Sequence, residues 1–119
     1  MELTYGELVK VIEGLRALSE KQLRPVSSLR VARWMSRVRS ELGVYDITRS
    51  NLIKELGKYD KKTDTWSIDQ KDSAVVSDFM KKNDEMLAEK TKVDLEPLTE
   101  EDLVAIEPKW VELLLPIMQ

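Results

Sequence analysis

The sequence contains neither histidine nor cysteine, and this double absence excludes several kinds of functional site. Without imidazole or thiol there is no Ser-His or Cys-His nucleophile pair and no zinc site of the usual nitrogen and sulfur ligands. The carboxylates, lysines, arginines and hydroxyls that remain catalyse only where burial or close pairing shifts their pKa values. The sequence therefore favours a protein that is not an enzyme and that has no cofactor and no metal.

Long hydrophobic runs are also missing. The first residues, Met1-Glu2-Leu3-Thr4, lack the basic and then apolar pattern of a signal peptide, and no apolar run approaches the roughly 20 residues of a membrane span. The 119 residues are 42% hydrophobic and 34% charged, which is typical of a folded, helix-rich chain. We expect a single domain over residues 1–119 in a cytosolic setting, with no membrane.

The first segment has the pattern of an amphipathic helix. Thr4 and Glu7 match a capping box, in which the Thr4 hydroxyl accepts from the third helical N–H and Glu7 reaches back to the cap N–H. Apolar residues then recur at spacings of three and four: Leu8, Val11, Ile12, Leu15 and Leu18. We expect this helix to end near Glu20, and Arg24 to be non-helical because it precedes Pro25.

A longer helix follows, with Ser27 or Ser28 predicted as its cap. Its apolar seam has a heptad-like spacing with one skipped place at Arg49: Val31, Met35, Val38, Leu42, Tyr45, Leu52 and Leu56. Gly43 costs a helix about 1 kcal/mol relative to alanine and indicates a kink or a break into two helices as alternatives. We favour one long, bent helix because the seam keeps its phase across Gly43.

The second half of the chain mixes short elements. Residues 59–68 predict a weak β-hairpin, and Asp69 or Asp72 begins a third helix that we expect to cover the core from one side. Residues 93–96 alternate apolar and acidic side chains, which favours a short strand that could join the hairpin as a third strand. The resulting fold class is mainly α with a minor β part: a helical body, a long heptad-like second helix and a small antiparallel β-hairpin or three-stranded element.

Two further helix starts are predicted near the C-terminus. Residues 99–102 resemble a capped first turn, with acidic side chains at the positive end of the helix dipole. Pro108 suits the first position of a last helix, which Pro116 limits.

Charge is distributed unevenly along the chain. Residues 1–62 carry 13 Lys and Arg against 8 Asp and Glu, whereas residues 63–119 carry 6 against 14. All seven arginines precede residue 50. This asymmetry indicates a basic helix packed beside an acidic segment, and alternatively a basic binding face.

Arginines on the second helix form the sharpest local pattern. Arg30, Arg33 and Arg37 share one face, Trp34 lies beside them and Arg39 is near. Such a strip is suited to phosphates or to an acidic partner, because the planar guanidinium binds paired oxygens. The simpler interpretation is a solvated face with ion pairs to the acidic second half, which also fits the sequence pI of about 5.1.

An acidic cluster near the C-terminus is a weaker candidate. Its members are Glu96, Glu100, Glu101, Asp102 and Glu107. They lack the alternating Asp and Asn ligands and the central glycine of a calcium loop, so a solvated helix start is the favoured interpretation and no metal site is predicted.

The last residues are too apolar for an exposed tail. Trp110, Leu113, Leu114 and Ile117 are either part of the core or a self-association surface, and core burial is the more common explanation. Because the long seam adds further apolar surface, we expect a homodimer or larger homo-oligomer with Trp110 as an anchor.

The order of these elements resembles an uncharacterised family of small phage and prophage proteins. The resemblance rests on the Leu23-Arg24-Pro25-Val26 step, the stretch from Tyr45 to Lys58, the hairpin, and residues 93–98 followed by Glu101-Asp102-Leu103. It implies a phage or prophage origin, with the bacterial host cytoplasm or the virion as the setting. It carries over no catalytic residue, and the hairpin turn Lys62-Thr63-Asp64 lacks the glycine expected of the family.

These observations together predict a non-enzymatic phage or prophage accessory protein that acts through protein–protein binding. It would be a virion or assembly component or a host-directed factor, and its protein partner is unknown. The alternative is a nucleic-acid-associated phage protein that uses the arginine-rich helix face.

Overall fold

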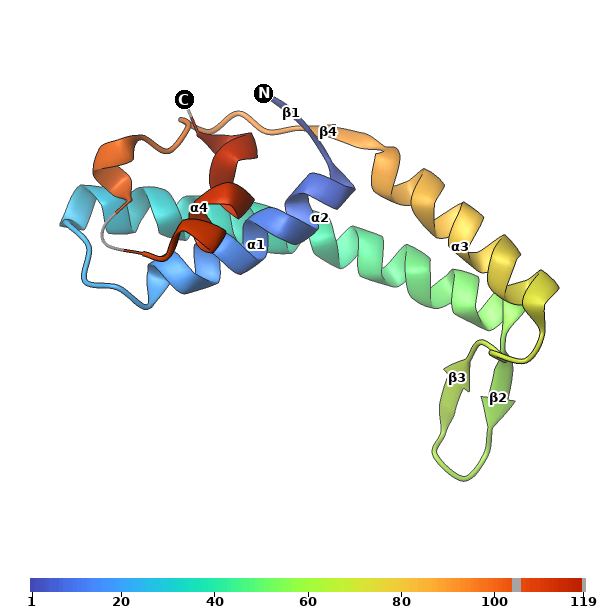
Figure 1. The fold of residues 1–119 in the computed structure, drawn as a ribbon. Helices are drawn as coiled ribbons and strands as arrows, with labels where there is room; N and C mark the ends of the chain where they lie inside the picture. The colour runs from blue at the N-terminus through green and yellow to red at the C-terminus, as the bar shows by residue number, and fades with distance from the viewer. Residues whose placement is uncertain (104–105, 119) are drawn as a thin grey trace.

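The computed structural model describes residues 1–103 and 106–118 (Figure 1). The order of the elements confirms a mainly helical fold with a minor β part. The elements are β1 (Glu2–Thr4), α1 (Tyr5–Ser19), α2 (Pro25–Leu56), β2 (Lys58–Asp60), β3 (Thr65–Ser67), α3 (Ser73–Ala88), β4 (Lys90–Lys92), η1 (Glu100–Asp102), α4 (Pro108–Leu114) and η2 (Leu115–Ile117).

Helix α1 begins as the sequence predicts. The Thr4 hydroxyl accepts from the Glu7 N–H at 3.0 Å, and the Glu7 carboxylate accepts from the Thr4 N–H at 2.9 Å. This reciprocal pair satisfies two N–H groups that the first helical turn leaves unpaired. The apolar stripe of α1 is buried along its whole length, so α1 forms one wall of the core.

Helix α2 is one unbroken helix, as predicted, but the prediction that Ser27 or Ser28 caps it is wrong. The helix begins at Pro25, and Arg24 is the cap residue with an extended backbone (φ −61°, ψ 149°). Proline suits this position because its ring fixes a helical φ and because the first helical N–H has no partner within the helix. The helix continues through Gly43 to Leu56.

The core lies at one end of the molecule, which we call the body. It is built from α1, the first half of α2, the segment around residues 93–98, and the C-terminal helices α4 and η2. Its buried apolar side chains come from all of these elements and from β1: Leu3, Leu8, Val11, Ile12, Leu15, Leu18, Val31, Trp34, Val38, Val93, Leu98, Leu114 and Ile117. Gly14 allows the close approach of α1 and α4, since a Cβ there would lie 2.7 Å from Leu114 Cγ.

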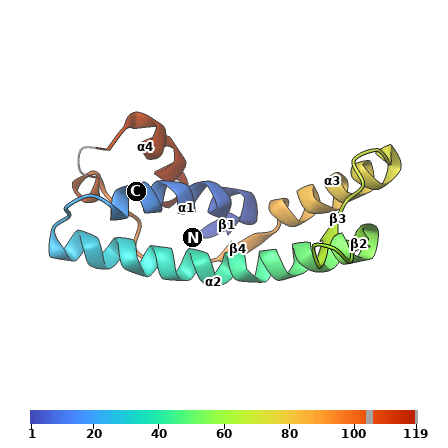
Figure 2. The same cartoon turned by 90° about the horizontal axis from the view of Figure 1, so that it is seen from below.

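The rest of the chain, residues 43–89, projects from the body as an arm (Figures 1 and 2). It comprises the second half of α2, the β2–β3 hairpin and α3. The Cα radius of gyration is 17.3 Å, against about 13.5 Å for a compact chain of this length. The long second helix therefore carries chain well beyond the core.

Helix α3 does not cover the core, and the prediction that it would is wrong. The structure describes every residue of the arm, and Leu52 on α2 is its single buried side chain, while α3 buries none. Helix α3 begins at the Asp72 cap, packs along the second half of α2 and is tied there by the Tyr45 hydroxyl, which donates to Asn83 Oδ1 at 2.7 Å. Its apolar side chains are half-buried or exposed, because α3 lies only against the second half of α2 and the start of α1.

Two separate pairs of antiparallel strands make up the β part. The hairpin of β2 and β3 is confirmed, and Asp64 in its turn has φ 51°, a left-handed conformation that non-glycine residues adopt rarely. The predicted strand at residues 93–96 is wrong: the strand is β4, at residues 90–92, and it pairs with β1 and not with the hairpin. Strand β1 immediately precedes α1, so this pairing fixes the end of the arm to the body.

The C-terminal segment closes over α1. Thr99 and Asp102 form the predicted capping box, but the turn is a single 3₁₀ helix, η1. Pro108 begins α4 as predicted, and the chain continues through Pro116 in η2. Leu98 N–H donates to Ile117 C=O at 2.8 Å, which ties the segment before η1 to the end of the chain.

The uneven burial leads to a prediction about local stability. Amide hydrogens in the middle of α3 should exchange with solvent at least 10-fold faster than those in the middle of α1, because opening α3 exposes little apolar surface. Hydrogen exchange followed by NMR measures both helices in one sample. Equal protection of α1 and α3 would contradict the division into body and arm.

Candidate functional site

Among the residues that the structure describes, the buried carboxylate of Asp102 makes the largest number of side-chain hydrogen bonds. It is fully buried at the end of η1 and accepts from the Ser27 hydroxyl at 2.6 Å and from the Thr99 N–H at 3.0 Å. Arg30 Nη1 lies 3.3 Å from Asp102 Oδ2. These bonds hold η1 against the first turns of α2.

The surroundings of Asp102 keep it ionised. Burial alone would raise its pKa, but hydrogen bonds from Ser27, Thr99 and Arg30, together with the positive charge of Arg30, outweigh burial and hold the pKa of Asp102 below the ordinary value of 3.8. A general acid needs the opposite shift, towards the working pH. The geometry gives Asp102 a structural role, and none of the described buried side-chain nitrogen or oxygen atoms lacks a hydrogen-bond partner.

The arginine strip of α2 is partly occupied by contacts within the chain. Arg30 pairs with Asp102 and Glu96, and Arg37 donates to the Lys92 carbonyl at 3.0 Å and pairs with Glu41 at 3.1 Å. These contacts match the interpretation of a basic helix packed beside acidic residues. The Arg30 and Arg37 groups are therefore less available for nucleic acid than the sequence pattern indicates.

Trp34, the aromatic residue of the strip, is not on the surface. Its side chain is 1% exposed, and its indole N–H donates to the Glu96 carbonyl at 2.8 Å. Arg33 and Arg39 are exposed, and within residues 1–103 and 106–118 they make no ion pair. Of the residues predicted to contact a partner or nucleic acid, Arg33 and Arg39 are therefore the two whose charges are exposed and not paired within the described residues.

The predicted self-association residues are divided between core and surface. Leu114 and Ile117 are fully buried in the core of their own chain. Trp110 and Leu113 are half-buried, and Lys109 Nζ lies 4.8 Å from the centre of the Trp110 ring. Two of the four residues thus belong to the fold and cannot also face a second copy.

A groove with exposed aromatic and methionine side chains lies in the arm, between the second half of α2, β3 and α3. Its volume is about 370 Å³, and we call it the arm groove. Its lining residues are Arg49, Ile53, Trp66, Ser67, Ile68, Gln70, Val76, Phe79 and Met80. Trp66 is 42% exposed and Met80 57% exposed, so the groove is open to solvent.

Arg49 lines this groove and contributes a positive charge to it. The Arg49 guanidinium lies over the Phe79 ring, 5.6 Å from its centre, which orients the group through a cation–π contact. Arg49 makes no ion pair within the described part of the chain. An apolar groove with one oriented cation fits an apolar side chain that is followed by a carboxylate.

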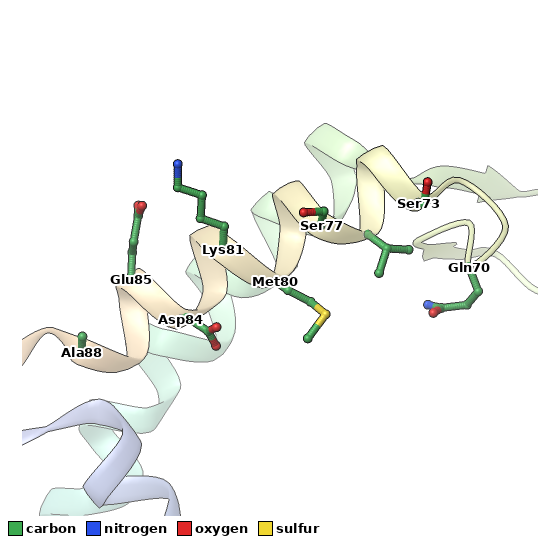
Figure 3. A pocket seen from close by; sticks show the side chains of 9 residues that line it. Gln70, Ser73, Ser77, Met80, Lys81, Asp84, Glu85 and Ala88 are labelled. Carbon is green, nitrogen blue, oxygen red and sulfur yellow. The ribbon is translucent and has the colours of Figure 1, made fainter.

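A second, wider hollow of about 860 Å³ lies on the outer face of α3. Figure 3 shows Met80 and Asp84 on one side of this helix and Lys81 and Glu85 on the other. Charges of both signs line this hollow, and no buried polar group points into it. Gln70, Val76 and Met80 line both hollows, so the two hollows adjoin.

The amino-acid sequence alone does not predict the arm groove. Trp66 lies within the predicted hairpin of residues 59–68, and Arg49 is the skipped place in the apolar seam of α2. The charged Arg49 within this apolar seam is the one sequence feature that points to the groove, because a charged residue at such a position lies beside the helix face that packs on its neighbours. Its pairing with Phe79, 30 residues later, depends on tertiary structure.

The described residues contain neither a cluster of metal ligands nor a membrane-spanning helix. In residues 1–103 and 106–118, no three Asp or Glu side chains gather closely enough to hold a metal ion. None of the helices described there has the length and apolar content needed to cross a membrane.

Comparisons of the chain with protein-family models, curated proteins and solved structures found no match.

Proposed function

We propose that this protein acts without catalysis, by binding another protein through the arm groove. The observation that carries the proposal is the exposed Trp66 and Met80 beside the oriented cation of Arg49, on an arm that projects from the body. Aromatic and methionine side chains dominate protein–protein contacts, because they bury large areas and adapt to the partner surface.

The partner segment that fits the groove has an apolar side chain next to an acidic one. The apolar side chain would fill the space between Trp66, Val76 and Met80, and the carboxylate would pair with Arg49. This assignment is in keeping with the resemblance to small phage and prophage proteins, whose setting would be the bacterial host cytoplasm or the virion. The protein would then serve as an assembly component or as a factor directed at a host protein.

Binding should depend on the groove and not on exposed apolar residues in general. Trp66→Ser combined with Met80→Glu should weaken binding of the partner at least 100-fold while the chain stays folded, because Trp66 is 42% exposed and Met80 57% exposed and neither belongs to the core. The measurement is affinity capture from phage-infected host cells, followed by titration of the purified partner.

Leu115→Ser is the matched control, since Leu115 is an exposed aliphatic residue of the body, outside the arm. A partner retained equally by all variants would contradict the proposal. A peptide series of one apolar residue followed by Asp or Asn adds a direct measurement. The Asp peptides should shift the Trp66 indole NMR signal, and Arg49→Gln should abolish the preference for Asp over Asn.

A further inference from the structure

A second groove runs along the contact between α2 and α3. It begins as a hollow of about 170 Å³ at the junction of body and arm, which is lined by Tyr5, Val44, Tyr45, Thr48, Met86 and Glu89. It continues into a wider hollow of about 510 Å³ between the second half of α2 and the end of α3. Thr48, Met86 and Glu89 line both hollows, so the two form one groove, which we call the junction groove.

The junction groove and the arm groove lie on opposite flanks of the contact between α2 and α3. At 100° per residue, Thr48 of the junction groove lies on one side of the buried Leu52, and Ile53 of the arm groove lies on the other. On α3, Glu85 of the junction groove points away from Met80 of the arm groove (Figure 3). The junction groove is therefore a separate surface.

The narrow end of the junction groove is aromatic and held in place. The Tyr5 and Tyr45 rings stack with their centres 6.3 Å apart. The Tyr5 hydroxyl donates to Glu41 Oε2 at 3.0 Å. The Tyr45 hydroxyl donates to Asn83 Oδ1 at 2.7 Å, so both rings have fixed positions. Val44, which is 57% exposed, extends the apolar wall, and such a wall suits the aliphatic stem of a long side chain.

The rim of the junction groove is negatively charged. Glu55, Glu85 and Glu89 line it, and none of these three makes an ion pair within residues 1–103 and 106–118. Lys82 also lines the groove, but its charge is neutralised by Asp78 at 3.3 Å. The groove therefore offers free carboxylates beside an apolar wall, which is complementary to cations on aliphatic stems.

The pKa of Tyr5 reflects the same negative charge. Burial raises the pKa of the Tyr5 hydroxyl above its ordinary value of 10.0, and the hydrogen bond to Glu41 raises it further. The negative charges of Glu41 and Glu89 add to this rise, and Arg37 opposes it. The charge of Glu89 thus acts within the tyrosine-lined end of the groove.

We infer that the junction groove binds a basic peptide segment of another protein, with one Arg or Lys side chain between the tyrosine-lined walls and further cations along the carboxylates. Long cationic side chains match both parts, because their stems pack on apolar surface while their charged ends reach the rim. From Tyr45 to Glu55 the groove is about 15 Å long, which accommodates about five residues of an extended peptide. The site is separate from the arm groove and does not rest on the proposed function.

Titration of the protein with a pentapeptide of three arginines and two leucines tests the site. This peptide should bind at least 10-fold more tightly than the same peptide with neutral citrulline in place of arginine, and its affinity should fall as the ionic strength rises. The Met86 methyl NMR signal should shift on binding, and the Trp66 indole signal should not. Equal binding of the citrulline peptide, or a shift at Trp66 without one at Met86, would overturn the proposal.

Removing two rim carboxylates separates the groove from the net charge of the chain. Glu85→Gln combined with Glu89→Gln should weaken binding of the arginine peptide about 5-fold to 10-fold, because two exposed ion pairs are lost with little change of shape. Glu20→Gln combined with Glu112→Gln is the matched control, since it removes two exposed carboxylates from the body. An equal loss of affinity in both double variants would mean that binding follows net charge, and the assigned site would be wrong.

Val44→Lys tests the tyrosine-lined end of the groove. The new ammonium repels a bound cation, so affinity for the arginine peptide should fall at least 10-fold, while circular dichroism stays unchanged because Val44 is an exposed helical residue. Ile47→Lys is the matched control, since Ile47 is 67% exposed on the same helix and outside the groove. Spermidine should bind more weakly than the peptide, because it lacks planar guanidinium groups. Equal binding of spermidine would assign the groove to small polyamines and overturn the peptide.

Discussion

Replacing Trp34 by alanine should lower the free energy of unfolding by about 3–5 kcal/mol. The side chain is 1% exposed in the centre of the body, where truncation leaves a cavity that its neighbours cannot fill by small movements. The change also removes the donor to the Glu96 carbonyl, a bond of 2.8 Å that fixes the segment before η1 to α2. Denaturant unfolding followed by circular dichroism measures the loss.

Trp66→Ala is the matched control, because it removes the same residue type from an exposed site. It should cost less than about 1 kcal/mol. Trp34→Phe keeps an aromatic ring but removes the indole N–H and part of the ring volume, so its loss of stability should lie between those of the two alanine variants. A loss below about 1 kcal/mol for Trp34→Ala would mean that the body does not pack around this residue.

Replacing Asp102 by alanine should cost about 2–4 kcal/mol at pH 7. The change leaves the buried Ser27 hydroxyl and the Thr99 N–H without their acceptor and removes the ion pair with Arg30. Glu101→Ala is the control on the same turn, because Glu101 is an exposed residue whose ion pair with Arg24 contributes little.

The effect of Asp102 should depend on pH in a defined direction. Its pKa in the folded chain lies below the ordinary value of 3.8, so the ionised group stabilises the fold fully above that value. As the pH falls through the folded-state pKa, this stabilisation is lost. Unfolding curves of wild type and Asp102→Asn from pH 7 to pH 2 should therefore converge at the acid end. A stability difference that stays constant over the whole range would contradict the depressed pKa.

Local chemistry made much of the fold predictable. The Thr4 and Glu7 capping box, the unbroken α2 and the proline at the start of α4 all follow from residues close together in sequence. The burial of Trp34 is predictable as well, since Trp34 follows Val31 by three residues and precedes Val38 by four, which is the spacing of the core face. Its position among arginines led instead to a surface assignment.

What the sequence could not provide was the placement of elements relative to one another. The pairing of β1 with β4 joins residues almost 90 positions apart, and nothing in a run of Lys90, Thr91 and Lys92 indicates a strand in isolation. The position of α3 is similar: its apolar residues predict burial, but only tertiary packing shows that they rest on the second half of α2. The arm groove depends on that packing and was therefore missed.

The continuity of α2 through Gly43 gives the arm no hinge. A 32-residue helix is about 48 Å long, so a tilt of about 5° at its first turn displaces its far end by about 4 Å. The η1 turn, held by Asp102 and Arg30, presses against that first turn, whereas the hairpin with Trp66 stands at the other end. More than half of α2 lies in the body and the remainder in the arm, so any tilt of the helix moves the hairpin and Trp66 as one piece with the body half of α2.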